Sequence, residues 1–318
     1  MIKTLDLKAG MSPSDASISK NFIYYTDEHS MPMAQFGYAA TLYRYDLASE
    51  KTQKMLDLKF EHYGVVRELF AGEDHIFFTG DIMSSGETIL WEYRISTPSL
   101  EPIYRYSHPI ALAYEHPYLV WYEIDEESLE DKPLYPKEIP GIMKCYNVQN
   151  KELYALSPGH RILSPYQRVN ILKGVVTFFT RENDRCFVHT YDLKTDRILW
   201  SKEIGAIGSR AVSNERFTVY SANSVFGDLK IRIIDREDPS YSIPEIDAYL
   251  NYALQGDLLH IFYSDKIILF DLKTAESKPI FQTEGLLGYG IGESGGYVLE
   301  LFDHHSEKKH QLVYKHDP

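Results

Sequence analysis

Short runs of apolar residues, rich in aromatic and β-branched side chains, recur along the chain and are separated by polar turn segments. Such runs are typical of β-strands, and no segment keeps a helical period for more than a few turns. One phrase repeats: an apolar strand ends in an aromatic residue, often followed by Asp-Leu. Its aromatic column reads Tyr45, Tyr93, Tyr146, Tyr191, Ile234, Phe270 and Tyr314. Successive copies are about 45 residues apart, which is close to the length of a propeller blade.

Each copy contains four predicted strands, as in residues 168–172, 175–178, 188–193 and 197–200. The last copy lacks a fourth strand, whereas residues 2–7 alternate as a strand that belongs to no copy. Pairing this segment with the last copy would protect the strand edges. We therefore predict one all-β domain over residues 1–318. Its fold would be a seven-bladed β-propeller of four-stranded blades, with the ring closed by the N-terminal strand completing the last blade. A ring of six or eight blades is the alternative if one degenerate copy is miscounted.

The Tyr-Asp-Leu-x-Thr-type phrases at Tyr45, Tyr191 and Phe270 resemble those of the broad β-propeller superfamily of WD40-like, TolB-like and quinoprotein-like repeats. The resemblance spans the whole chain and implies the propeller architecture. The Gly-His and Trp-Asp marks of WD40 blades and the double glycine of kelch blades are absent, so the resemblance identifies no specific family.

Charge and composition narrow the class of function. The 318 residues carry a formal net charge of −13, which argues against a general nucleic-acid binder. Two cysteines, Cys145 and Cys186, are too few for a disulfide framework or a four-cysteine zinc site. The sequence has neither the apolar segment of a secretory signal nor a run long enough to cross a membrane. We expect a cytoplasmic monomer with no membrane or nucleic-acid partner.

Three sequence patterns that could suggest a catalytic, phosphate-binding or metal site are better explained as parts of turns and strands. Asp46, Asp192, Asp235 and Asp271 occupy one position of the repeat, where a carboxylate would accept N–H groups of the following turn. The glycines of residues 288–296 precede a strand, whereas a phosphate loop precedes a helix. His304 and His305 are adjacent and would point to opposite faces of a strand. We therefore expect no metal, no cofactor and no assigned catalytic residue.

One candidate site can be built from the predicted starts of the first strands of the blades. These starts would converge on one mouth of the central channel, and three of them carry arginine: Arg67, Arg168 and Arg210. The nearby polar residues are Asp15, Glu68, Asn170, Asn251 and Tyr252. Converging arginines in an acidic chain would bind a carboxylate or phosphate. The competing interpretation is that these arginines form structural links, since a slip of one residue would reverse each side chain.

Two long loops are predicted on the same face. Residues 29–39 contain His29, Met33, Phe36 and Tyr38, and residues 125–141 contain Tyr135 among six acidic residues. Loops often carry binding residues, although either segment could be a tolerated insertion.

The function predicted from these observations is a non-catalytic propeller scaffold that binds a protein partner or a small anionic ligand. The alternative is an enzyme, a hydrolase, lactonase or lyase of a sugar-derived acid, with arginines holding the carboxylate and a histidine or Tyr252 as acid or base.

Overall fold

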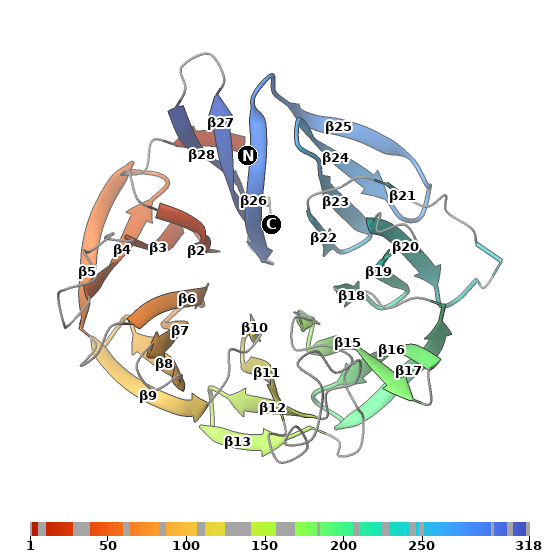
Figure 1. Ribbon diagram of the computed structural model, residues 1–318, viewed down its shortest axis with the longest axis horizontal. Helices are drawn as coiled ribbons and strands as arrows, with labels where there is room; N and C mark the ends of the chain where they lie inside the picture. The colour runs from red at the N-terminus through yellow and green to blue at the C-terminus, as the bar shows by residue number, and fades with distance from the viewer. Residues whose placement is uncertain are drawn as a thin grey trace. The chain divides into compact units, whose positions relative to one another are not determined.

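A computed structural model gives the fold (Figure 1), and every described element is a β-strand. The structure describes residues 2–5, 11–27, 39–59, 64–82, 87–106, 112–124, 141–156, 169–182, 185–205, 210–223, 229–238, 240–241, 246–247, 251–293, 296–303 and 308–315. The strands form four-stranded antiparallel sheets that fall into two compact units.

The first unit contains residues 1–109 and 282–318. One of its sheets is formed by β2 (Met11–Ser19), β3 (Phe22–Asp27), β4 (Ala39–Asp46) and β5 (Lys51–Lys59). The next is formed by β6 (Gly64–Ala71), β7 (His75–Ile82), β8 (Glu87–Arg94) and β9 (Ser99–Tyr106). The third combines both ends of the chain: β26 (Leu286–Glu293), β27 (Gly296–Asp303), β28 (Lys308–Lys315) and β1 (Ile2–Leu5).

The second unit contains residues 110–281 and four sheets. The first two are β10 (Leu112–Glu115), β11 (Tyr118–Ile124), β12 (Gly141–Asn147) and β13 (Glu152–Ala155), then β14 (Asn170–Leu172), β15 (Val175–Glu182), β16 (Arg185–Asp192) and β17 (Arg197–Ile204). The last two are β18 (Ala211–Ser213), β19 (Phe217–Asn223), β20 (Leu229–Asp235) and β21 (Ile246–Asp247), then β22 (Asn251–Gln255), β23 (Leu258–Phe262), β24 (Lys266–Asp271) and β25 (Ser277–Gln282).

The predicted pairing of the two chain ends is confirmed, because β1 pairs with β28 from Ile2 opposite Tyr314 to Leu5 opposite Gln311. The predicted closed ring of seven blades needs correction. Six sheets are blades of four consecutive strands, whereas the remaining sheet is a composite of both termini. The sheets also divide between two compact units. The fold is thus described by six sequential blades and one composite sheet. The single domain over residues 1–318 stays a prediction.

The aspartates of the repeat form the predicted turns. The carboxylate of Asp46 accepts hydrogen bonds from the Ala48 N–H at 2.8 Å and the Ser49 hydroxyl at 2.9 Å. Asp192 accepts the Lys194 N–H, and Asp271 accepts the Lys273 N–H. The Thr195 hydroxyl also donates to Asp192, at 2.5 Å. Hydrogen bonds from Ala48 and Ser49 to Asp46, and from Thr195 and Lys194 to Asp192, hold the pKa of both carboxyls below the usual range, because they stabilise the ionised form.

The core lies between neighbouring sheets, so strand interiors are buried on both faces. In the first unit, Leu42 and Tyr24 of one sheet pack with Ile76 and Phe78 of the next. In the second unit, Val120 and Cys145 pack with Val176 and Phe178. This two-sided burial explains why the strands read as nearly continuous apolar runs.

Tight turns place several non-glycine residues in the left-handed region. Ala275, at the end of the β24–β25 turn, has a φ of 57°. Replacing Ala275 with glycine is expected to raise the free energy of unfolding by about 0.5–1 kcal/mol, because glycine adopts this conformation without a Cβ clash. Urea unfolding checks the value. The matched control is Ala48→Gly, in the equivalent turn of β4–β5 but outside the left-handed region, and should be destabilising. A loss of stability in Ala275→Gly would contradict the assigned turn conformation.

Candidate functional site

Arg210 lies immediately before β18, where the first strand of its blade begins, and is half-buried. Its backbone is fixed by Ser221 of β19: the Arg210 N–H donates to Ser221 Oγ at 3.0 Å, and the Ser221 N–H donates to the Arg210 carbonyl at 2.9 Å. The strand pairing therefore determines where this arginine side chain begins.

The Arg210 guanidinium reaches the first strand of the next blade. Its Nη1 donates to Asn251 Oδ1, and its Cζ lies 5.2 Å from the centroid of the Tyr252 ring. The Asn251 Oδ1 also accepts the Tyr252 N–H at 2.8 Å. A ring below the guanidinium and an amide at one edge hold the planar cation in one orientation.

The phenol of Tyr252 completes this cluster. Its hydroxyl donates to the Arg210 carbonyl at 2.7 Å, and the residue is only 1% exposed. Its proton is therefore held by a backbone acceptor and not presented to solvent. This arrangement argues against Tyr252 as the acid or base of an enzyme.

Asn170 adds a third strand to the cluster. Its Nδ2 donates to the carbonyl of Ala211 at 2.8 Å, which links β14 to β18. Three successive first strands of the second unit therefore bring together four residues of the predicted site, namely Asn170, Arg210, Asn251 and Tyr252.

The other predicted residues lie either in the first unit or outside the described residues. Asp15 lies in β2, and Arg67 and Glu68 lie in β6, all in the first unit. Arg168 and the loop residues His29, Met33, Phe36, Tyr38 and Tyr135 lie outside the described residues. The convergence of three arginines thus stays a prediction.

Glu68 has a feature that the sequence did not indicate. It has a φ of 47° and is the extra residue of a bulge in β6, between Arg67 opposite Thr79 and Leu69 opposite Phe78. Side chains therefore do not alternate uniformly from Arg67 to Leu69, because an inserted residue changes which side chains share a face.

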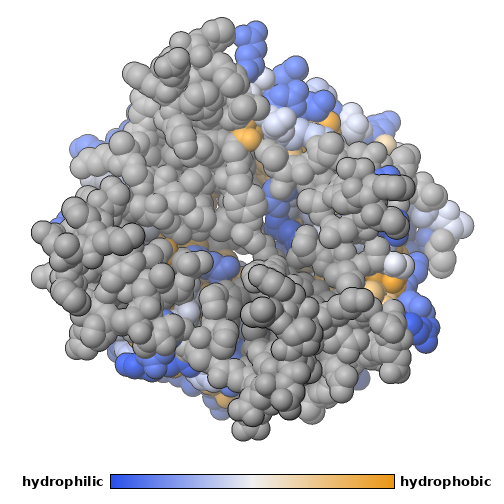
Figure 2. Space-filling model, viewed as in Figure 1, coloured by the Kyte–Doolittle hydropathy of each residue, from blue (hydrophilic) through white to orange (hydrophobic). Residues whose placement is uncertain are grey.

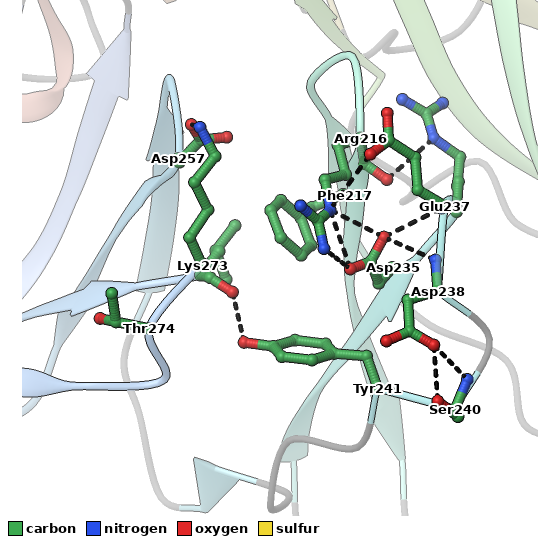
Figure 3. Close-up of polar contacts among 12 residues, drawn as sticks. Arg216, Phe217, Asp235, Glu237, Asp238, Ser240, Tyr241, Asp257, Lys273 and Thr274 are labelled. Carbon is green, nitrogen blue, oxygen red and sulfur yellow. Dashed lines mark hydrogen bonds and ion pairs between the residues drawn. The ribbon is translucent and has the colours of Figure 1, made fainter.

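A second polar cluster, which the sequence interpretation missed, lies at the opposite ends of the same strands (Figure 3). Arg216 follows β18, and its Nε donates to both carboxylate oxygens of Asp235, at 3.0 and 2.9 Å. Asp235 also accepts the Glu237 N–H at 2.9 Å. In the next blade, Lys273 forms an ion pair with Asp257. These contacts join turns within each blade, and the Tyr241 hydroxyl links the two blades by donating to the Leu272 carbonyl.

Arg236 shows which signal could have revealed this cluster. Its N–H donates to the Arg216 carbonyl at 2.9 Å, just as the Leu193 N–H donates to Gly174 and the Leu272 N–H donates to Asp257. At this position the other described copies carry buried or half-buried aliphatic residues, whereas Arg236 places its guanidinium against the Trp200 ring, 5.9 Å from the centroid. A charged residue in an apolar column of the repeat was the available signal.

No group of three or more potential metal ligands occurs among the residues that the structure describes, and His304 and His305 lie outside them. Burial raises the pKa of the Cys145 thiol to about 11, so this cysteine stays protonated at neutral pH.

No described helix is long and apolar enough to span a membrane. On the face drawn in Figure 2, the described residues are mostly hydrophilic, with scattered apolar positions.

Comparison with known proteins supports the fold and no particular family. No family model matches the chain, and no curated protein matches its sequence. The β-propeller domain of the Trilobed protease from Pyrococcus furiosus is similar in structure, with a TM-score of 0.64 at 11% identity, covering 95% of this chain and 92% of that one. An oligogalacturonate lyase in complex with manganese has a TM-score of 0.59 at 13% identity over 93% and 86% of the two chains. The WD40 domain of Toxoplasma gondii coronin has a TM-score of 0.58 at 9% identity over 98% and 85%. The comparisons thus show a β-propeller fold.

Proposed function

We propose that this chain is a non-catalytic binding propeller that holds a small anionic ligand through Arg210. The observation that carries the proposal is the orientation of the Arg210 guanidinium by Tyr252 and Asn251 at the start of two adjacent first strands. A guanidinium has five N–H donors, and the described contact with Asn251 uses Nη1. The planar, forked geometry of a guanidinium suits a carboxylate or phosphate.

The charge of the whole chain makes this position distinctive. The net charge of −13 disfavours anions on average, so a fixed cation at a strand end is a local site of attraction. The same type of fold occurs in the coronin WD40 domain and in a chain of the mitotic checkpoint complex, so a carboxylate of a protein partner is within this proposal.

The test is isothermal titration with uronic acids, phosphosugars, nucleotides and acidic peptides, comparing the wild type with Arg210→Gln. We expect a bound anion to lose about 10- to 100-fold in affinity in the variant, the cost of one charge-assisted contact. The matched control is Arg44→Gln, because Arg44 also stacks on an aromatic ring, 4.7 Å from the Phe22 centroid, and contacts the amide oxygen of Gln53 at 2.6 Å. Equal affinity in Arg210→Gln, or binding by no member of the panel, would reject the proposal.

The alternative is a lyase or hydrolase acting on a sugar acid, and its specific support is the structural similarity to the oligogalacturonate lyase. Arg210 would then hold the substrate carboxylate, but Tyr252 donates its proton to a carbonyl and is poorly placed for proton transfer. Incubation with oligogalacturonate and manganese, with cleavage monitored by ultraviolet absorbance, separates the two functions. Cleavage that Arg210→Gln abolishes would favour the enzyme.

A further inference from the structure

Three side chains of the second unit form a continuous chain of hydrogen bonds across β15, β16 and β17. Thr180 Oγ1 lies 2.7 Å from His189 Nε2, and His189 Nδ1 lies 2.6 Å from Ser201 Oγ. The register places His189 directly opposite Ser201 on the neighbouring strand. A hydroxyl, an imidazole and a second hydroxyl are therefore aligned in one path.

The three residues differ in exposure along this path. Thr180 is fully buried and His189 is 3% exposed, whereas Ser201 is exposed on β17, an edge strand of its sheet. The imidazole also stacks between two aromatic rings, 5.0 Å from the Phe178 centroid and 6.1 Å from the Phe187 centroid. A fixed histidine thus connects a buried hydroxyl to one that reagents can reach.

Each ring nitrogen of His189 contacts one hydroxyl, and the tautomer sets which nitrogen donates and which accepts. If Nε2–H donates to Thr180 Oγ1, Nδ1 is left as the acceptor of the Ser201 hydroxyl proton. An exposed nucleophile, a base within hydrogen-bond reach and a third group orienting the base are the arrangement that activates serine in acyl transfer. Thr180 carries no charge, so its contribution is to position the ring.

The pairing of His189 with Ser201 differs from the pairs at the same position of the other blades with a described register. At the same cross-strand position, the other blades with a described register carry Tyr43 opposite Lys54, Trp91 opposite Pro102 and Lys144 opposite Ala155. Folding of a blade therefore does not require histidine opposite serine. The combination belongs to one blade, and it lies on strands other than those that hold Arg210.

We propose that Ser201 is a reactive serine that accepts acyl groups from activated esters, with His189 as its base and Thr180 as a positioning residue. Ser201 Oγ attacks the carbonyl carbon and forms the new C–O bond, while its proton passes to His189 Nδ1. The bond between the carbonyl carbon and the leaving oxygen then breaks, and the alcohol or phenol takes up the electron pair and a proton. No oxidant or reductant is required.

The experiment treats the full chain with 4-nitrophenyl acetate and follows acetylation of individual peptides by mass spectrometry. We expect acetyl-Ser201 to form, to be absent in Ser201→Ala, and to form about 100-fold more slowly in His189→Gln, the usual contribution of a general base. Ser49 is the matched internal control, because it is also exposed but hydrogen-bonds to the carboxylate of Asp46 and not to an imidazole.

The second comparison uses substitutions of Thr180, which leave the base His189 in place. Thr180→Val should slow labelling about tenfold, whereas Thr180→Ser, which keeps the hydroxyl, should restore most of the rate. Thermal melting verifies that each variant is folded. Labelling of Ser201 no faster than that of Ser49, or an unchanged rate in folded Thr180→Val and His189→Gln, would overturn the proposal. Anion binding through Arg210 should be the same in Ser201→Ala, so the two proposals fail independently.

Discussion

Replacement of Phe217 by alanine is expected to lower the free energy of unfolding by about 3–5 kcal/mol, the range for a fully buried phenylalanine. Phe217 is 0% exposed and packs in a cluster that joins its blade to the next, with Leu254 and Leu259 among its members. The Arg216 guanidinium covers the ring at 5.0 Å, and Tyr241 lies 6.0 Å away. The neighbours belong to two sheets and cannot collapse together to fill the cavity.

Urea unfolding followed by tryptophan fluorescence measures this change. The matched control is Phe22→Ala, because Phe22 occupies the same position of the repeat, as first residue of β3, and is only partly buried. Its substitution should cost about half as much, since less apolar area is lost. Equal losses in the two variants would show that Phe217 is not a special contact between blades.

Replacement of Asp235 by asparagine is expected to lower the free energy of unfolding by about 2–3 kcal/mol at neutral pH, because it removes the buried carboxylate of the Arg216 ion pair and leaves only the exposed Glu237 as a charged partner. Asp235 is 3% exposed. The hydrogen bonds that its carboxylate accepts from the Arg216 guanidinium hold the pKa of this carboxyl below its ordinary value near 3.8. A lowered pKa in the folded protein means that the stabilisation is present above the unfolded pKa. It is lost as the pH falls through the folded value.

The stability difference between wild type and Asp235→Asn should therefore be largest near neutral pH and shrink below about pH 4. Denaturant unfolding at several pH values, on both proteins, gives the comparison. Asp271→Asn is the matched control, because Asp271 holds the equivalent turn of the next blade through the N–H groups of Lys273 and Thr274. A difference for Asp235→Asn that does not change with pH would refute the ion-pair account.

The structure brings together four of the eight residues that the sequence predicted at the channel mouth. The repeat alignment placed Asn170, Arg210 and Asn251 near the starts of first strands, and the structure brings these three together with Tyr252. Alignment could not predict that Glu68 is an inserted bulge residue, because a bulge depends on how β6 pairs with β7. Nor could it find Ser201 beside His189, since that contact depends on the register between β16 and β17.

The sequence by itself determined the features that depend on neighbouring residues. Alternation and β-branched content specify the strands, and Asp46, Asp192 and Asp271 specify their turns through bonds two or three residues away. The unpaired first strand and incomplete last copy likewise predicted the contact of β1 with β28. Only the tertiary structure decided which arginine stacks on Tyr252, which pairs with Asp235, and how the sheets group into two units. These outcomes depend on the register and stagger of whole sheets, where a shift of one residue exchanges the faces of a strand.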